Sequence, residues 1–172
     1  GSEMCIRDSS GSGWYAGDNA SYLTAYSGGE YRVYEKDSNG WVLPAAPFQC
    51  ENCSIDVDAR FEGTPYHGYG LFFAGSGDDW YMFIARLDTG KCDLLKHTSS
   101  GLTLLASKNC SLQTTSNHLR VEWQAPAIRV YINGNLIHSL NNSSFSGVGD
   151  IGVITYWQGD ARFDNFVVRA LP

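Results

Sequence analysis

The acidic residues whose spacing could support catalysis lie in one short segment, Asp56-Val57-Asp58-Ala59-Arg60-Phe61-Glu62. Alternate positions of a strand point to the same face, so Asp56 and Asp58 would share one surface. Two carboxylates about 5–5.5 Å apart can cleave a glycosidic bond with retention. Arg60 would lie on the same surface and keep its neighbours ionised, which is the wrong direction for a general acid. We therefore expect a solvated strand face here, with catalysis by Asp56 and Asp58 as the alternative.

The cysteines suggest covalent cross-links rather than a reactive site. Cys92 and Cys110 would lie on opposite arms of a hairpin turning near Ser99–Gly101, and closing that loop would stabilise the fold by about 3 kcal/mol. Cys50 and Cys53 could close a small loop before a strand. The alternatives for this CxxC, half a zinc site or a thioredoxin-type motif, lack a second ligand pair and a following helix. Two disulfides would indicate an oxidising compartment, and so a secreted protein.

Aromatic side chains in turns are the candidates for ligand binding, because sugar C–H faces pack on flat rings while hydroxyls need polar partners. The candidates are Trp41, Tyr66, His67 and Trp157, the last with Gln158 and Asp160 beside it. Trp157 ranks first, since it combines an indole with two hydrogen-bonding neighbours. The alternative is that these rings cover the edge of the core. A shallow site of this kind would bind weakly, at about −4 to −8 kcal/mol.

Composition narrows the class of protein. The chain has 172 residues, a formal charge of −6, 13% aromatic residues and 19 glycines. It has no basic stripe that would indicate nucleic-acid binding, and no apolar run approaches the roughly 20 residues that span a bilayer. Its length fits one domain with a sizeable core.

Period-2 alternation dominates from residue 29 onward and predicts many short strands without helices. The expected strands are residues 31–34, 53–62, 68–74, 80–87, 91–97, 102–107, 118–124, 127–132, 135–140, 151–156 and 162–171. Asn133-Gly134 is a strong two-residue hairpin signal. This pattern predicts an all-β antiparallel sandwich with Phe61, Phe72, Phe83, Trp123, Phe163 and Phe166 in its core.

The first residues are set apart from this domain. Gly1-Ser2 look like the remnant of a tag, and Glu3–Ser9 resembles translated sequencing-adapter read-through from environmental bacterial assemblies. We therefore expect residues 1–12 to lie outside the fold and residues 13–172 to form the sandwich.

The order of motifs carries a resemblance that covers roughly residues 14–172. The motifs include Ile55–Arg60, Gly68–Phe73, Asp79–Phe83, Tyr131–Gly134 and Phe163–Val168. The chain resembles the concanavalin A-like, laminin G-like jelly rolls, including the family 16 glycoside hydrolase-like and 3-keto-disaccharide hydrolase-like domains. Laminarinase-like members carry a Glu-x-Asp-x-x-Glu strand on the concave face, and the segment at Asp56 lacks its paired glutamates.

The resemblance also implies a possible metal. Related sandwiches often hold a structural Ca²⁺ near their chain ends, and Asp164, Asn165 and Asp18 could supply oxygen ligands. The alternative, which we favour, is that Asp164-Asn165 forms a bulge that turns Phe163 and Phe166 to the same inward face. We expect no other cofactor.

Three functions compete on this evidence, because the fold alone does not select one. We favour a non-catalytic extracellular carbohydrate-binding or adhesion module, whose partners would be an oligo- or polysaccharide and other domains of a larger protein. The second is a structural, self-assembling extracellular subunit without a small ligand. The third is a glycan-cleaving enzyme that uses Asp56 and Asp58.

Overall fold

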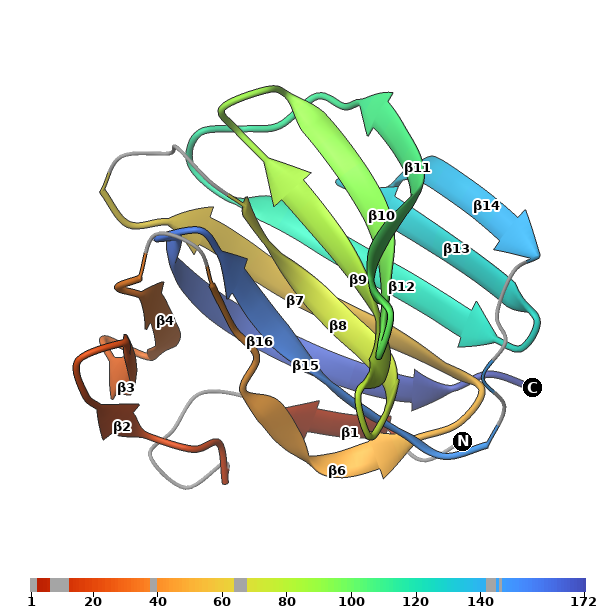
Figure 1. The fold of residues 1–172 in the computed structure, drawn as a ribbon, viewed down its shortest axis with the longest axis horizontal. Coiled ribbons are helices and arrows are strands. Elements are labelled where there is room, and N and C mark those ends of the chain that lie inside the picture. Colours follow the sequence, from red (N-terminus) through yellow and green to blue (C-terminus); the bar gives the residue numbers. More distant parts are fainter. Residues whose placement is uncertain (1–2, 7–12, 38–39, 64–67, 142–144, 146) are drawn as a thin grey trace.

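Two antiparallel sheets pack face to face as a β-sandwich in the computed structural model (Figure 1). The structure describes residues 3–6, 13–37, 40–63, 68–141, 145 and 147–172, with residues 3–6 described by their main chain. Within these residues there is no helix, and so none that could cross a membrane. The predicted all-β, single-domain sandwich is confirmed.

The first sheet, sheet A, contains the strand that carries Asp56 and Asp58. Its strands, in spatial order, are β14 (Asn135–Asn141), β13 (Ala127–Ile132), β12 (Asn117–Gln124), β7 (Cys53–Phe61), β16 (Asp160–Ala170), β4 (Glu30–Glu35), β3 (Tyr22–Ser27) and β2 (Gly17–Asp18). A further strand, β1 (Glu3–Ile6), pairs with β16. The main chain of Glu3–Ile6 thus pairs with sheet A, although residues 1–12 were expected to lie outside the sandwich.

The second sheet, sheet B, lies in front of sheet A in Figure 1. Its strands, in spatial order, are β11 (Gly101–Asn109), β10 (Lys91–Thr98), β9 (Asp79–Arg86), β8 (Gly68–Ser76), β15 (Gly149–Tyr156) and β5 (Trp41–Val42), while β6 (Ala45–Cys50) also pairs with β15. The strand predicted to be central because both its faces are apolar is β9, and it lies between β8 and β10.

The core between the sheets is built from the alternate positions that the sequence indicated. Trp123, Phe83, Phe163 and Phe166 are buried in it, and Phe61 packs against it while partly exposed. The prediction that Phe72 lies in the core between the sheets is wrong. Phe72 is buried on the outer side of sheet B, in a second cluster with Met82, Ile84 and Ile154. β8 is apolar at neighbouring positions, so alternation could not tell its two faces apart.

The bulge predicted at Asp164-Asn165 is present. The pairing of β16 with β7 shifts between Asp164 and Val167, and Asn165 has a positive φ of 52°. The shift brings both Phe163 and Phe166 to the inward face, at 3% and 4% exposure. One extra residue in a strand has this effect because side-chain direction alternates with a period of two.

Both predicted disulfides are formed. Cys92–Cys110 joins β10 to the end of the β10–β11 hairpin, and Cys50–Cys53 joins the end of β6 to the start of β7. The two cross-links therefore tie sheet B within itself and to sheet A.

Candidate functional site

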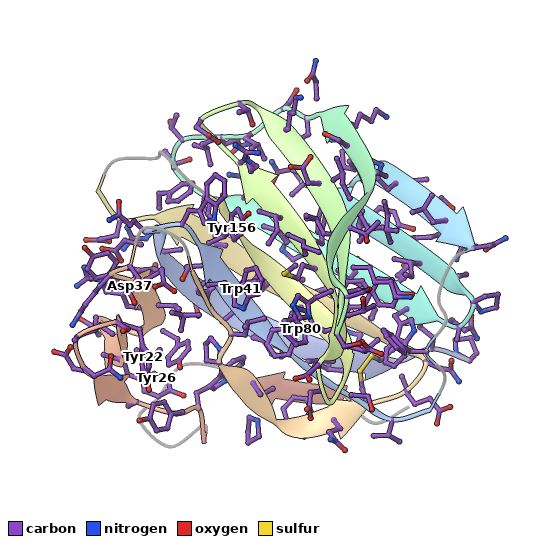
Figure 2. All side chains as sticks on the ribbon, in the orientation of Figure 1. Tyr22, Tyr26, Asp37, Trp41, Trp80 and Tyr156 are labelled. Carbon is purple, nitrogen blue, oxygen red and sulfur yellow. A yellow bond between two sulfur atoms is a disulfide. The ribbon has the colours of Figure 1, made fainter. Side chains whose placement is uncertain are left out.

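The outer surface of sheet B, which we call face B, gathers aromatic side chains from strands far apart in the sequence. Strand register places Trp41 of β5 opposite Tyr156 of β15, and Trp80 of β9 opposite His97 of β10. Figure 2 shows Tyr156, Trp41 and Trp80 lying over the front of sheet B. We call these four residues the aromatic cluster.

Ring contacts make the aromatic cluster continuous. Trp80 stacks on His97 with ring centroids 3.9 Å apart and planes inclined by 8°. Trp41 meets both of them edge to face, at 6.3 Å and 5.4 Å, and lies parallel to Tyr156 at 6.2 Å. Offset stacked and edge-to-face arrangements are the favourable geometries for aromatic pairs. The rings therefore hold one another in place and form a rigid surface.

A hydrogen bond fixes one member of the cluster further. His97 Nδ1 lies 2.7 Å from the main-chain oxygen of Asp78, so this nitrogen donates to the carbonyl. The bond orients the imidazole plane on which the Trp80 indole stacks.

Glycines keep the floor of face B low. A Cβ on Gly68 would lie 2.3 Å from Ile84 Cγ2, and a Cβ on Gly152 would lie 2.5 Å from the ring of Phe72. The larger side chains instead fold over the glycines. This gives a flat apolar floor, formed by Phe72, Met82, Ile84 and Ile154, beneath the aromatic cluster.

Beside the aromatic cluster, face B is hollowed by a small cavity of about 60 Å³. Its lining combines an apolar floor with polar groups on one side; the lining residues are Met82, Ile84, Arg86, Asp93, Leu95, Leu102 and Tyr156. Arg86 donates to Asp88 at 3.1 Å and lies 3.8 Å from Asp93 Oδ2. The hydrogen bond to Asp88 is the main reason that the pKa of Arg86 is raised, so the guanidinium stays charged.

The polar side of the hollow has unused hydrogen-bonding capacity. Asp93 is only 7% exposed, and its Oδ1 atom has no hydrogen-bond partner among the described residues. The indole Nε1 of Trp80 is likewise buried without a partner in that part of the chain. Buried polar atoms are nearly always hydrogen-bonded in proteins, so two unsatisfied atoms on one face indicate groups that a bound molecule could satisfy.

Tyr156 connects the aromatic cluster to the hollow. Burial raises the pKa of its phenol, while the Arg86 charge opposes this shift. The hydroxyl therefore stays protonated at neutral pH and can donate a hydrogen bond. Face B thus places flat rings beside a hollow that is lined by the Asp93 carboxylate, the Arg86 guanidinium and the Tyr156 phenol.

The structure separates the candidates that the sequence grouped around Trp157. Trp157 is 42% exposed and stacks on Tyr156 at 4.8 Å, so it extends the aromatic cluster that contains Trp41. Gln158 is exposed in the same turn. Asp160 begins β16 and pairs with Arg32 of sheet A, so its carboxylate is directed away from the cluster.

Tyr66 and His67 lie outside the described residues, so their proposed ligand-binding role stays a prediction.

The outer surface of sheet A, which we call face A, contains the two aspartates of the catalytic alternative. His118 of β12 bridges them, with Nδ1 2.7 Å from Asp58 Oδ1 and Nε2 3.0 Å from Asp56 Oδ1. Arg169 also donates to Asp56 at 3.0 Å. The hydrogen bond to Asp56 is the largest cause that raises the pKa of His118 to about 9. The two carboxylates therefore share a charged imidazolium.

The rest of face A repeats this pairing of opposite charges. Arg60 donates to Glu30 and to Glu62, and Arg162 also donates to Glu62, at 2.7 Å. The hydrogen bond from Arg162 is the main reason that the pKa of Glu62 is lowered. Face A is the charged strand surface that the alternation of residues 53–62 predicted, but Asp56 is buried beneath its partners instead of solvated.

The calcium candidates do not converge. Asp18 lies in β2, three strands away from β16 in sheet A, and its carboxylate pairs with Lys36. The Asp164 carboxylate accepts a hydrogen bond from the main-chain N–H of Asn165, and the side-chain amide of Asn165 donates one to Asp58. Among the described residues, no group of three or more His, Cys, Asp or Glu side chains could hold a metal ion. These residues do not fit an oxygen-rich calcium site.

Sequence reasoning missed most of face B. Tyr156, Arg86, Asp93 and His97 lie within strands, whereas the search considered aromatic residues in turns. Nothing in the sequence signalled Asp93, because a charged residue between the apolar positions Cys92 and Leu94 is what alternation predicts for a solvent-facing side chain.

Known structures with this fold include proteins that act on or bind carbohydrates. The chain superposes on the carbohydrate-binding module CBM66 from Bacillus subtilis with a TM-score of 0.79 and 16% identity, covering 92% of this chain and 96% of that one. The β-glucanase of Bacillus licheniformis gives a TM-score of 0.70 at 14% identity, covering 98% of both chains. The laminarinase catalytic domain of Thermotoga maritima gives a TM-score of 0.62 at 10% identity, covering 87% of this chain and 81% of that one.

These similarities confirm the jelly-roll fold that the sequence motifs indicated. No protein-family model and no curated protein matches the chain. At 10–16% sequence identity, the structural similarity supports the fold alone and does not assign a function.

Proposed function

We propose that this domain is a non-catalytic, extracellular carbohydrate-binding module that holds its ligand on face B. The observation that carries the proposal is the arrangement of the aromatic cluster next to a hollow whose lining includes Asp93, with one carboxylate oxygen that has no hydrogen-bond partner among the described residues. A sugar ring presents apolar C–H faces and a rim of hydroxyls, so it needs stacking surfaces and polar partners side by side. Trp41 and Tyr156 supply the stacking surfaces, and Asp93 and Arg86 supply the polar partners.

The chemistry of the hollow favours neutral sugars over anionic ones. Asp93 Oδ1 can accept from a hydroxyl, and the Arg86 guanidinium can donate to one. The single positive charge of Arg86 is shared between Asp88 and Asp93. The hollow therefore has no surplus positive charge for an acidic sugar.

The comparisons support a carbohydrate role without defining it. One similar structure is named as a carbohydrate-binding module and two as carbohydrate-degrading enzymes. Retaining hydrolysis needs an acid and a nucleophile on opposite sides of the substrate bond. Asp88 and Asp93 pair with the same guanidinium, and Asp56 and Asp58 share His118 on the other sheet. These pairings favour binding without cleavage.

The two disulfides support an extracellular location. Disulfides persist in oxidising compartments and are rare where thiols are kept reduced. Both pairs of cysteines lie in the sandwich itself, at or next to the ends of strands.

The test is a binding assay on insoluble polysaccharides and a glycan array, with reducing-sugar release measured in the same samples. Trp157→Ala removes an exposed ring that stacks on Tyr156, and we expect it to weaken binding roughly tenfold. Tyr34→Ala, a change to a tyrosine outside face B, is the matched control and should bind as the wild type does. Thermal melts establish that both variants are folded.

The outcomes separate the competing functions. Binding that Trp157→Ala weakens, without sugar release, supports the module. Sugar release that Asp56→Asn abolishes would establish the enzyme instead. No binding across the panel, together with concentration-dependent assembly in sedimentation, would favour a structural subunit.

A further inference from the structure

A second hollow lies on the other side of Trp41 from the small cavity of face B. Its volume is about 270 Å³, and it is lined by residues from the segment before β2, from β3 and from the region of β5; these are Tyr15, Tyr22, Thr24, Trp41, Val42, Leu43 and Pro44. We call it the edge groove. It lies where β2 and β3, the end of sheet A, approach β5, the end of sheet B.

Trp41 lies between the two hollows and lines only the edge groove. It also stacks parallel to Tyr156, which lines the small cavity. Figure 2 shows Tyr22 to one side of Trp41, with Tyr156 on the other. No other described aromatic residue lines the edge groove and contacts the aromatic cluster. A molecule lying across Trp41 would therefore reach from one hollow into the other.

The exposed aromatic side chains mark the two ends of this path. Among the aromatic residues that the structure describes, only Tyr15 and Trp157 are exposed, at 60% and 42%. Trp157 stacks on Tyr156 at one end. Tyr15 lines the edge groove at the other end, with its ring centroid 6.4 Å from that of Tyr22. Large exposed rings are costly to leave in water, and on a protein surface they gather where ligands bind.

The edge groove has the mixed lining that suits a sugar. Tyr15 and Tyr22 carry hydroxyls, while Val42, Leu43 and Pro44 provide an apolar wall. The groove is also anchored, because Tyr31 donates to the main-chain oxygen of Tyr15 at 2.6 Å. A hydrogen bond to the main chain holds the position of Tyr15 whatever its side chain contacts.

Resting on the proposed function, we infer that the ligand is an oligosaccharide or polysaccharide chain and that the edge groove binds the residues that follow the one held at face B. A single sugar would occupy one hollow and leave Tyr15 exposed. A chain that continues over Trp41 would cover both exposed aromatic residues. The module would then select chains by length as well as by the sugar in the first hollow.

The experiment measures affinity against chain length by calorimetry. The probes are cello-, laminari- and manno-oligosaccharides from the disaccharide to the hexasaccharide. For the wild type, we expect affinity to rise roughly tenfold along the series that binds, because stacking on one further aromatic residue adds about this factor. In Tyr15→Ala and in Tyr22→Ala, the short members should bind as they do to the wild type, and the gain with length should be lost.

Controls keep the failure of this inference distinct from failure of the proposed function. Tyr34→Ala should keep the full gain with length. If affinity does not depend on length, or if Tyr15→Ala and Tyr22→Ala retain the gain, the edge groove is not a subsite, even if Trp157→Ala still weakens binding. If the wild type binds none of the probes and no polysaccharide in the pull-down, the proposed function and this inference both fail.

Discussion

Face A and face B are the outer surfaces of two sheets with similar strands, yet they use their polar groups in opposite ways. On face A, opposite charges are matched across neighbouring strands, as in the Asp56–His118–Asp58 bridge. On face B, rings dominate and the Oδ1 atom of Asp93 is buried without a described partner. A surface whose charges neutralise one another leaves few groups for a ligand to pair with, whereas a surface with unsatisfied groups is suited to a ligand.

The comparison has one exception on each face. Arg120 Nε on face A is buried without a hydrogen-bond partner among the described residues, although its other nitrogens contact Asp56 and Glu122. On face B, Arg86 and Asp88 form a pair of the kind that fills face A. The difference therefore lies in what surrounds the charges, since only face B places them beside an aromatic cluster.

The largest effect should come from Asp56, at the centre of the face A network. Its side chain is 7% exposed and contacts the cationic groups of His118, Arg120 and Arg169. Asp56→Asn should lower the free energy of unfolding by about 3 kcal/mol in urea denaturation, because at a buried position it replaces an acceptor oxygen with an NH2 donor that faces three partly exposed cationic groups. Glycan affinity should not change. A stable variant that has lost binding would contradict the division between the faces.

The control for this change is Asp58→Asn. Asp58 accepts from the same imidazole, but its side chain is 37% exposed, so water replaces much of the lost interaction. The expected loss is about 1 kcal/mol or less.

The two disulfides should differ in the stability that they provide to the two sheets. Cys92 and Cys110 are 18 residues apart in the sequence, whereas Cys50 and Cys53 are 3 apart, so the first disulfide closes the longer loop. On the chain-entropy model, replacing the first pair with serine should cost about 3 kcal/mol and the second about 2 kcal/mol. Denaturation of the two double variants measures the difference. Free thiols on all four cysteines in freshly purified protein would overturn both pairings and the extracellular assignment.

His118 should make the stability of face A depend on pH. Its folded pKa of about 9 lies above the ordinary value of 6.5, so its contribution is full below about pH 6.5 and is lost as the pH rises through 9. Because the imidazole is half exposed, screening limits the effect to about 1 kcal/mol. His118→Gln should therefore be less stable than the wild type near pH 6 and equal to it near pH 10. A constant difference across this range would show that packing, not charge, is lost.

Strand positions were predictable because alternation records which face each residue takes. β7 and β12 follow the pattern, with Ile55 and Val121 inward. The strands β3 and β6 were missed. β3 is partly buried at most positions on both sides, and β6 contains Pro47, so neither shows clear alternation.

The candidate site was only partly predictable, because it depends on register between distant strands. Trp41 and Trp157 were identified from their turns, but their connection through Tyr156 depends on the pairing of β5 with β15. The sequence pattern cannot show that Trp80 and His97 lie opposite each other, because that requires the pairing of β9 with β10.

The smallest expected effect concerns Asp160, which tests where face B ends. The sequence grouped Asp160 with Trp157 as a ligand-binding pair, whereas the structure gives its carboxylate two bonds from Arg32 in sheet A. Asp160→Asn retains an oxygen that can accept from Arg32, so unfolding should become easier by only about 0.5 kcal/mol. Glycan affinity should stay at the wild-type value, in contrast to Trp157→Ala. The same calorimetric titrations measure both variants. Equal losses of affinity would mean that the ligand passes around the end of β15 onto sheet A, and the boundary between the faces would then run through β16 instead of the turn at Trp157 and Gln158.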